Sequence, residues 1–158
     1  MEEIDKLNIA KEMLDAAIDE YLDHHRYFAA YNLAGVAEEL LGKFVRLNGG
    51  KDALTQSVES VKMVNKAING EEFTDKEWKK EISKLKNSIK HLDSVNDRHI
   101  STDIKDEVRW KINDAVKNFD ALNLNTTQNI ERYFERWREI MRHNKSLNQI
   151  GAKDAPPG

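Results

Sequence analysis

Two adjacent carboxylates, Glu38 and Glu39, lie near the middle of the most apolar stretch of this chain, residues 26–48. A helix that is apolar around most of its circumference belongs at the centre of a protein. A carboxylate at that depth needs a cation or hydrogen-bond donors, or its pKa rises and it becomes neutral. The pair is therefore either a structural device, in which a basic residue of a neighbouring helix neutralises Glu38, or a metal or acid–base site.

Helix geometry favours the structural interpretation of the two carboxylates. Neighbouring residues of a helix point about 100° apart, so the pair diverges. Carboxylate metal sites in helical bundles also use a Glu-x-x-His supplement, and the sequence contains no such spacing. We therefore expect Glu38 and Glu39 to fix the packing register of the helices, and we expect no metal and no cofactor.

Two glycines, Gly35 and Gly42, share one face of the same stretch with Glu39. Seven residues separate them, which is about two turns of a helix. Because glycine has no side chain, another helix can approach closely at each position. We expect a close helix contact here, either within the chain or with a second copy.

Asn87 and His91 are spaced i and i+4 and flank the apolar stripe of their segment, with Lys86 directly before them. Residues at this spacing share one face of a helix, and such a face can line a cleft. A solvated helix edge explains the same pattern more simply, because the helix dipole favours a basic residue near the C-terminal end.

Arginine and aromatic residues alternate in the last segment, where Arg132, Arg136 and Trp137 are the candidates for binding. Such a mixture can bind RNA through phosphate contacts and base stacking. Three glutamates interleave with the arginines, so pairing along the helix is the simpler interpretation. These glutamates are Glu131, Glu135 and Glu139.

Composition limits the class of protein that can hold these groups. With 158 residues, 39% of them hydrophobic, the chain fits one domain with one core. The net charge of -3 gives no overall basic field, and the lack of cysteine excludes disulfides, thiolate zinc sites and a cysteine nucleophile. The acidic start does not resemble a signal peptide, and no apolar run approaches the roughly 20 residues of a membrane span. We expect a cytoplasmic protein that does not insert into a membrane.

Apolar residues recur at helical spacing along most of the chain, which predicts an all-α protein. Both prolines fall at the end, at positions 156 and 157. We expect a single-domain bundle of five to six helices over residues 1–150 and a disordered tail over 151–158. The expected helices cover residues 4–21, 27–47, 54–68, 74–92, 103–122 and 130–147.

Residues 27–42 carry a Leu-Ala-Gly-x-Ala-Glu-Glu core that resembles small bacterial all-α proteins of the HEPN class. Residues 87–91 and 113–119 resemble later segments of the same proteins, so the likeness extends over residues 4–122. The resemblance implies a helical bundle that forms a homodimer. Many members of the class are metal-independent ribonucleases of toxin or defence systems, while others are inactive partners of nucleotidyltransferases or nucleotide-binding modules.

The resemblance also implies a site. The class signature is an arginine followed by a polar residue, and a histidine separated from that arginine by four to six residues. Lys86, Asn87 and His91 match it except that lysine replaces arginine. Lysine lacks the planar fork that grips a phosphate with two hydrogen bonds. In an active site of this type, His91 would polarise the phosphate or protonate the leaving oxygen while a ribose hydroxyl attacks. Side chains five residues apart on a helix point about 140° away from each other. Lys86 and His91 could therefore share one site only if the long lysine side chain reached across, if the helix were distorted, or if a second subunit contributed a residue.

Three functional hypotheses follow. The leading one is a homodimeric HEPN-like protein with a degenerate ribonuclease motif that binds RNA, a nucleotide or a protein partner. The alternatives are an active metal-independent endoribonuclease that uses His91, and a purely structural protein-interaction bundle. A basic cleft that gathers Lys86, Asn87 and His91 would favour the nuclease, whereas pairing of His91 with a buried carboxylate such as Glu38 would favour the other two.

Overall fold

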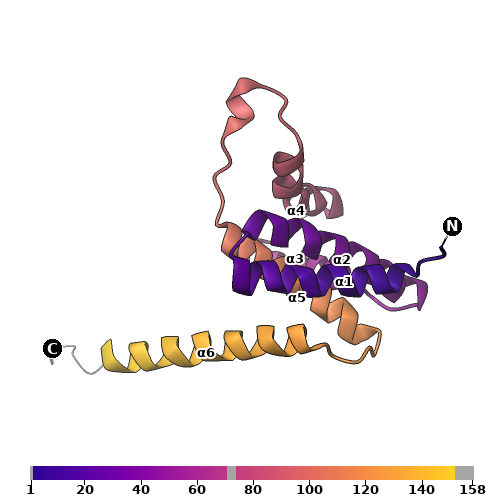
Figure 1. The fold of residues 1–158 in the computed structure, drawn as a ribbon. Helices are drawn as coiled ribbons and strands as arrows, with labels where there is room; N and C mark the ends of the chain where they lie inside the picture. The colour runs from indigo at the N-terminus through magenta and orange to yellow at the C-terminus, as the bar shows by residue number, and fades with distance from the viewer. Residues whose placement is uncertain (1, 71–73, 152–158) are drawn as a thin grey trace, which may run out of the picture. The chain divides into compact units, whose positions relative to one another are not determined.

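The computed structural model describes residues 2–70 and 74–151, and within these ranges the protein contains helices and no strands (Figure 1). The predicted all-α fold of five to six helices is confirmed. None of the helices in the described ranges is both long and apolar enough to cross a membrane. The six α-helices are α1 (Lys6–Asp19), α2 (Tyr27–Leu47), α3 (Ala53–Asn69), α4 (Asp75–Lys90), α5 (Ile104–Ala121) and α6 (Gln128–Gly151).

The chain divides into two compact units, Met1–Leu124 and Asn125–Gly158. The first contains α1 to α5, and the second contains α6. The single domain expected over residues 1–150 stays a prediction. Of the tail expected over 151–158, residue 151 ends α6, and residues 152–158 lie outside the described residues.

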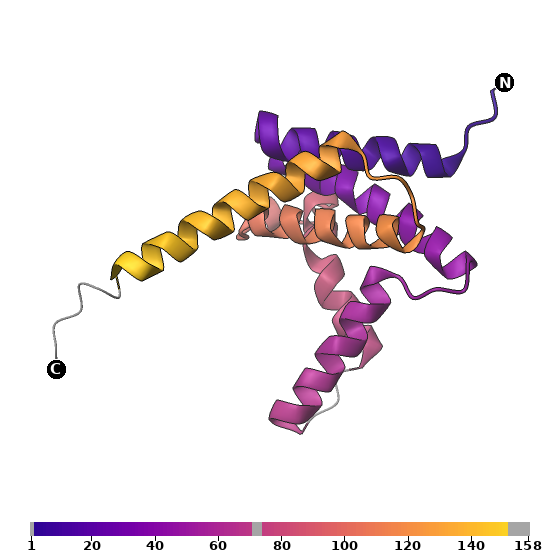
Figure 2. The same cartoon turned by 90° about the horizontal axis from the view of Figure 1, so that it is seen from below.

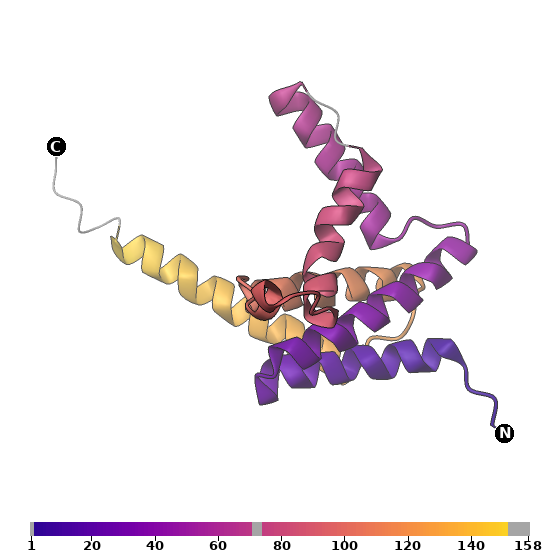
Figure 3. The same cartoon turned by 90° about the horizontal axis from the view of Figure 1, so that it is seen from above.

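Helix α2 is the centre of the first unit, where it packs against both α1 and α5. Helices α1 and α2 lie side by side in the views of Figures 1 and 3. The connection between them is a π-helical turn, Glu20–His24, which ends where His25 takes a left-handed backbone conformation with φ of 56°. The buried face of α2 is apolar apart from Glu38, as its central position requires. Its buried residues are Ala30, Tyr31, Ala34, Ala37, Glu38, Leu41, Gly42 and Val45.

Helices α3 and α4 follow the start and stop signals of the sequence. The Asp52 carboxylate caps α3 by accepting a hydrogen bond from the Thr55 backbone N–H at 2.9 Å. Gly70, with φ of 70°, ends the helix in the left-handed conformation that glycine adopts most easily. Thr74 and Glu77 form a capping box at the start of α4, where the expected helix over residues 74–92 begins. Helix α3 extends away from α1, α2 and α5, and α4 runs back toward α2 and α5, as Figures 2 and 3 show.

The predicted apolar stripe of α4 is wrong at its last residue. His91 has an extended backbone and ends the helix, so Leu92 lies beyond it and is 72% exposed. A short 3-10 turn, Val95–Arg98, follows in the connection to α5, which begins after the cap residue Asp103. The buried face of α5 agrees with the sequence pattern for Val108, Ile112, Ala115 and Phe119.

Candidate binding pocket

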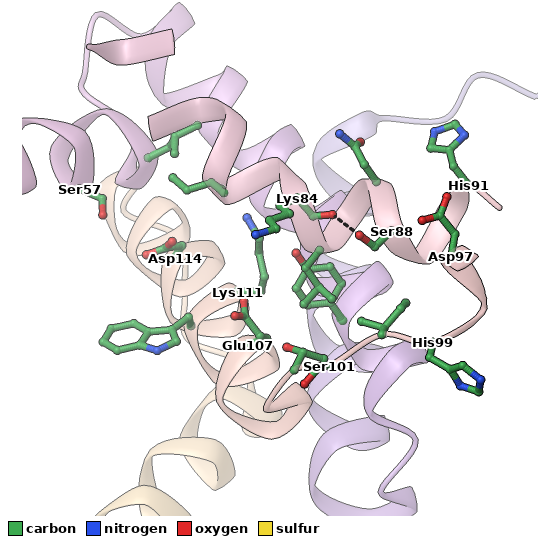
Figure 4. A pocket seen from close by; sticks show the side chains of 18 of the residues that line it. Ser57, Lys84, Ser88, His91, Asp97, His99, Ser101, Glu107, Lys111 and Asp114 are labelled. Carbon is green, nitrogen blue, oxygen red and sulfur yellow. Dashed lines mark hydrogen bonds between the residues drawn. The ribbon is translucent and has the colours of Figure 1, made fainter. Parts of the chain in front are cut away.

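An open pocket of about 1160 Å³ lies in the first unit between α2, α3, α4, α5 and the loop before α5 (Figure 4). We call it the large pocket. Three lysines and four carboxylates line it, a formal charge of -1 when the histidines are neutral. Its charged lining residues are Lys84, Lys111, Lys117, Asp93, Asp97, Glu107 and Asp114, and its larger apolar ones are Leu54, Val61, Ile82, Leu85, Ile100 and Trp110.

Asn87 and His91 both line the large pocket, in agreement with their shared helix face. His91 is exposed at the C-terminal end of α4, and His99 lies exposed in the loop that follows. In Figure 4 the rings of His91 and His99 point away from one another, so the two imidazoles do not converge on one point of the pocket. His91 therefore lies at the rim of the pocket, and within residues 2–70 and 74–151 no ion pair fixes its ring.

Lys86 lies apart from Asn87 and His91. It lines a second, small pocket of about 200 Å³, where its ammonium forms an ion pair with the Glu39 carboxylate of α2. Lys86 holds the pKa of Glu39 below its ordinary value, mainly through this hydrogen bond. The structure thus brings Asn87 and His91 to one pocket of the chain and Lys86 to another, as the divergence of about 140° on a helix requires.

Glu38 is buried, with 6% of its surface exposed, and faces α5. Its nearest cation is Lys111, whose Nζ lies 3.6 Å from Glu38 Oε2, so His91 is not its partner. Burial raises the pKa of Glu38 above its ordinary value, and the attraction of Lys111 offsets only part of that rise. This contact agrees with the structural role expected for Glu38, in which a lysine of a neighbouring helix compensates the carboxylate.

Glu38→Gln should become more stable relative to the parent as the pH rises above about 4.5. The pKa of Glu38 is higher in the folded protein than the ordinary 4.5, so the folded state holds a proton that the unfolded chain releases. The parent therefore loses stability as the pH rises between these two pKa values, by about 1.4 kcal/mol for each unit between them. Glutamine has no proton to lose. Urea unfolding of both proteins over a pH series gives the difference, and a difference that falls with rising pH would show that Lys111 outweighs burial.

A buried polar cluster, made by Gly42, Asp52 and Asn118, joins the helices that form the pocket walls. The Asn118 side chain of α5 accepts a hydrogen bond from the Ala53 N–H at 2.7 Å and donates one to the Glu38 carbonyl at 3.2 Å. Asp52 caps α3 and pairs with the Arg46 guanidinium. These contacts fix α2, the start of α3 and α5 to one another.

The two glycines of α2 have different surroundings. A Cβ atom at Gly42 would lie 3.1 Å from Asn118 Nδ2 and 3.2 Å from Asp52 Oδ2, so the backbone approaches these side chains closely. A Cβ atom at Gly35 would meet no atom of the described residues within 4 Å. The close approach expected at Gly35 is therefore not made within this chain, and an approach by a second copy stays a prediction.

Tyr31 and Glu107 line the large pocket and were not candidates from the sequence. Tyr31 is 2% exposed, and burial raises its pKa to about 12, with Glu107 and Glu38 adding to the rise. Sequence pattern placed Tyr31 on the apolar line of its helix, and Glu107 is one of many charged residues of α5. Only their placement across two helices brings them together.

The predicted residues Arg132, Arg136 and Trp137 all belong to α6, in the second unit. Arg136 pairs with Glu139 at 3.1 Å, and Arg132 donates a hydrogen bond to the Asn129 side chain at 3.0 Å. Two of the arginines thus have partners on their own helix. This pairing agrees with the interpretation of a salt-bridged helix face.

Comparison of the chain with protein-family models, with curated proteins and with solved structures finds no match. The resemblance to the HEPN class therefore stays a prediction. In the part of the chain that the structure describes, no group of three or more histidine, aspartate or glutamate side chains is arranged to hold a metal ion.

Proposed function

We propose that this protein binds a partner and does not cleave RNA, as a HEPN-like protein whose ribonuclease motif is degenerate. One observation carries the proposal: Lys86 pairs with Glu39 at the small pocket, whereas Asn87 and His91 line the large one. Catalysis of phosphodiester cleavage needs the acid or base and the phosphate-binding cation around one phosphate. Within one chain, the cation and the histidine do not meet this requirement.

Of the three possible ligands, RNA, a nucleotide and a protein, the large pocket best fits a protein. Two of its three lysines already have carboxylate partners, since Lys111 faces Glu38 and Lys117 lies 3.2 Å from Asp114. A polyanion binds by neutralising its phosphates with available cations, and this lining offers few. Protein interfaces combine apolar contact area with a polar rim, and the large pocket has both.

Homodimer formation and a cytoplasmic location belong to the same proposal. The resemblance to the HEPN class supports the dimer. A dimer also bears on the nuclease alternative, because a second subunit is one remaining source of a cation for His91. Sedimentation of the parent protein tests the dimer, and a monomer at all concentrations would contradict it.

The experiment that tests the function is cleavage of a labelled mixed-sequence RNA in EDTA, with the protein in excess over RNA. We expect no cleavage by the parent protein or by His91→Ala, because Lys86 and His91 lie at different pockets of the chain. The alternative function, a metal-independent endoribonuclease, predicts cleavage by the parent that the alanine variant loses. That result would overturn the proposal and place His91 in an active site.

A further inference from the structure

The side chain of Tyr31 is almost completely buried, but its hydroxyl oxygen reaches the surface of the pocket. Only 2% of this side chain is exposed, and it lines both the large and the small pocket. Among the residues that the structure describes, the hydroxyl makes no hydrogen bond, and its oxygen is not fully sealed from solvent. A hydroxyl that no protein group occupies, at the surface of a pocket, can accept a hydrogen bond from a ligand or donate one to it.

Glu107 supplies a second unpaired polar group on the wall formed by α5. It is partly buried and lines the large pocket, yet within residues 2–70 and 74–151 its carboxylate has no ion-pair or hydrogen-bond partner. Figure 4 places Glu107 one turn from Lys111 on the same helix wall. Lys111 is directed to Glu38 instead, so it does not neutralise Glu107.

Tyr31 lies among groups of both charges, and among the described residues Glu107 is the neighbouring carboxylate that has no cation of its own. The negative charges of two carboxylates, Glu107 and Glu38, raise the pKa of the hydroxyl. Lys111 forms an ion pair with Glu38 and none with Glu107. A carboxylate accepts hydrogen bonds only, and a hydroxyl can accept as well as donate. A ligand group that fits here must donate hydrogen bonds and carry positive charge, which describes an ammonium or a guanidinium group.

We propose that Tyr31 and Glu107 form a socket, in the floor and wall of the large pocket, for an organic cation carried on an apolar stem. The apolar side chains of Ile82, Leu85 and Ile100 line the same pocket and suit such a stem. The inference rests on the proposed function and specifies it: the cation is the lysine or arginine side chain of the protein partner. Long basic side chains have this build, a methylene stem with a charged end.

The test uses the full chain, isotope-labelled, with NMR spectra of its backbone amides during titration. The probes are hexylamine, the neutral 1-hexanol and the anionic hexanoate, all at one ionic strength. We expect saturable shifts of the amides near Tyr31 and Glu107 with hexylamine, and binding at least about tenfold weaker for the two other probes. Equal binding of hexylamine and 1-hexanol would overturn the socket, because charge would then contribute nothing.

Two variants separate a socket from a structural role. Glu107→Gln should weaken hexylamine binding by about tenfold, whereas the matched exposed variant Glu12→Gln should leave it unchanged. Tyr31→Phe should weaken binding several-fold and leave the melting temperature unchanged or raised, because the lost hydroxyl had no partner. Unchanged binding in Glu107→Gln, or a lowered melting temperature in Tyr31→Phe, would contradict the proposal.

A last pair of probes identifies the source of the cation. N-acetyl-lysine methylamide should shift the same amides as hexylamine, and its uncharged counterpart N-acetyl-norleucine methylamide should not. Binding of hexylamine without binding of the lysine compound would assign the socket to a free amine and overturn the protein partner. These results are independent of the RNA assay, since cleavage that requires His91 would remove the proposed function and leave the cation measurements as they are.

Discussion

Gly42→Leu is expected to lower the free energy of unfolding by about 3 kcal/mol, because side-chain atoms would enter a space that is already filled. Asn118 and Asp52 lie 3.1 and 3.2 Å from the position of the first added atom. Both are almost completely buried and held by hydrogen bonds, so neither can move without breaking contacts. Urea unfolding of the variant and the parent measures the difference.

Gly35→Leu is the matched control for this prediction, since it makes the same substitution two turns earlier on α2. The space around Gly35 is open within the chain, so the variant should keep the stability of the folded chain. A loss at Gly35 as large as that at Gly42 would show that the packing around Gly42 is not the cause. If the dimer forms through this face, Gly35→Leu should weaken it, which sedimentation would detect.

Asn118→Ala is expected to cost a similar amount, about 3 kcal/mol. The substitution leaves the buried Ala53 N–H without an acceptor and the Glu38 carbonyl without its Asn118 donor, and it also creates a small cavity. Thermal and urea unfolding measure the loss. The wall of the large pocket formed by α3 should also become more mobile, because the start of α3 is no longer fixed to α5.

Asn32→Ala is the control for the asparagine substitution. Asn32 is an exposed asparagine of α2 whose amide donates only to the carbonyl of Phe28, one turn earlier. Its replacement should change stability by no more than about 0.5 kcal/mol. If Asn118→Ala were equally harmless, the polar cluster would not hold the helices together.

Much of the fold could be predicted from sequence because its signals are local. The capping box of Thr74 and Glu77 and the glycine stop at Gly70 each involve residues within one helical turn. Leu92 shows the limit of this kind of reasoning. Its spacing continues the apolar stripe of α4, but the helix ends at Lys90, and periodicity alone does not reveal where a helix ends.

The candidate site could be predicted only in part, because it depends on contacts between distant segments. Helix geometry alone indicated that Lys86 and His91 diverge, and the structure places them at different pockets. The ion pair of Lys86 with Glu39 joins residues 47 positions apart, and no sequence pattern specifies it. Asn118 gave a weak signal as a polar residue next to the buried Phe119, yet its partners at positions 38 and 53 follow only from the fold.

Lys86, Asn87 and His91 lie in different surroundings in the structure. Lys86 contributes to an ion pair between α4 and α2, and Asn87 and His91 lie on the exposed side of α4 at the pocket. In this arrangement Lys86 joins α4 to α2, and Asn87 and His91 line the large pocket. Whether the lysine side chain at position 86 or its distance from His91 prevents RNA cleavage can be tested directly.

The most direct test of the central claim is cleavage of labelled mixed-sequence RNA in EDTA by Lys86→Arg, which introduces the arginine that the proposed HEPN signature has at this position. We predict no cleavage, because the arginine would still pair with Glu39 at the small pocket and stay apart from His91. Cleavage by Lys86→Arg that disappears on adding His91→Ala would contradict the account. It would show that only the lysine, and not the placement of the residues, keeps this protein from acting as a nuclease.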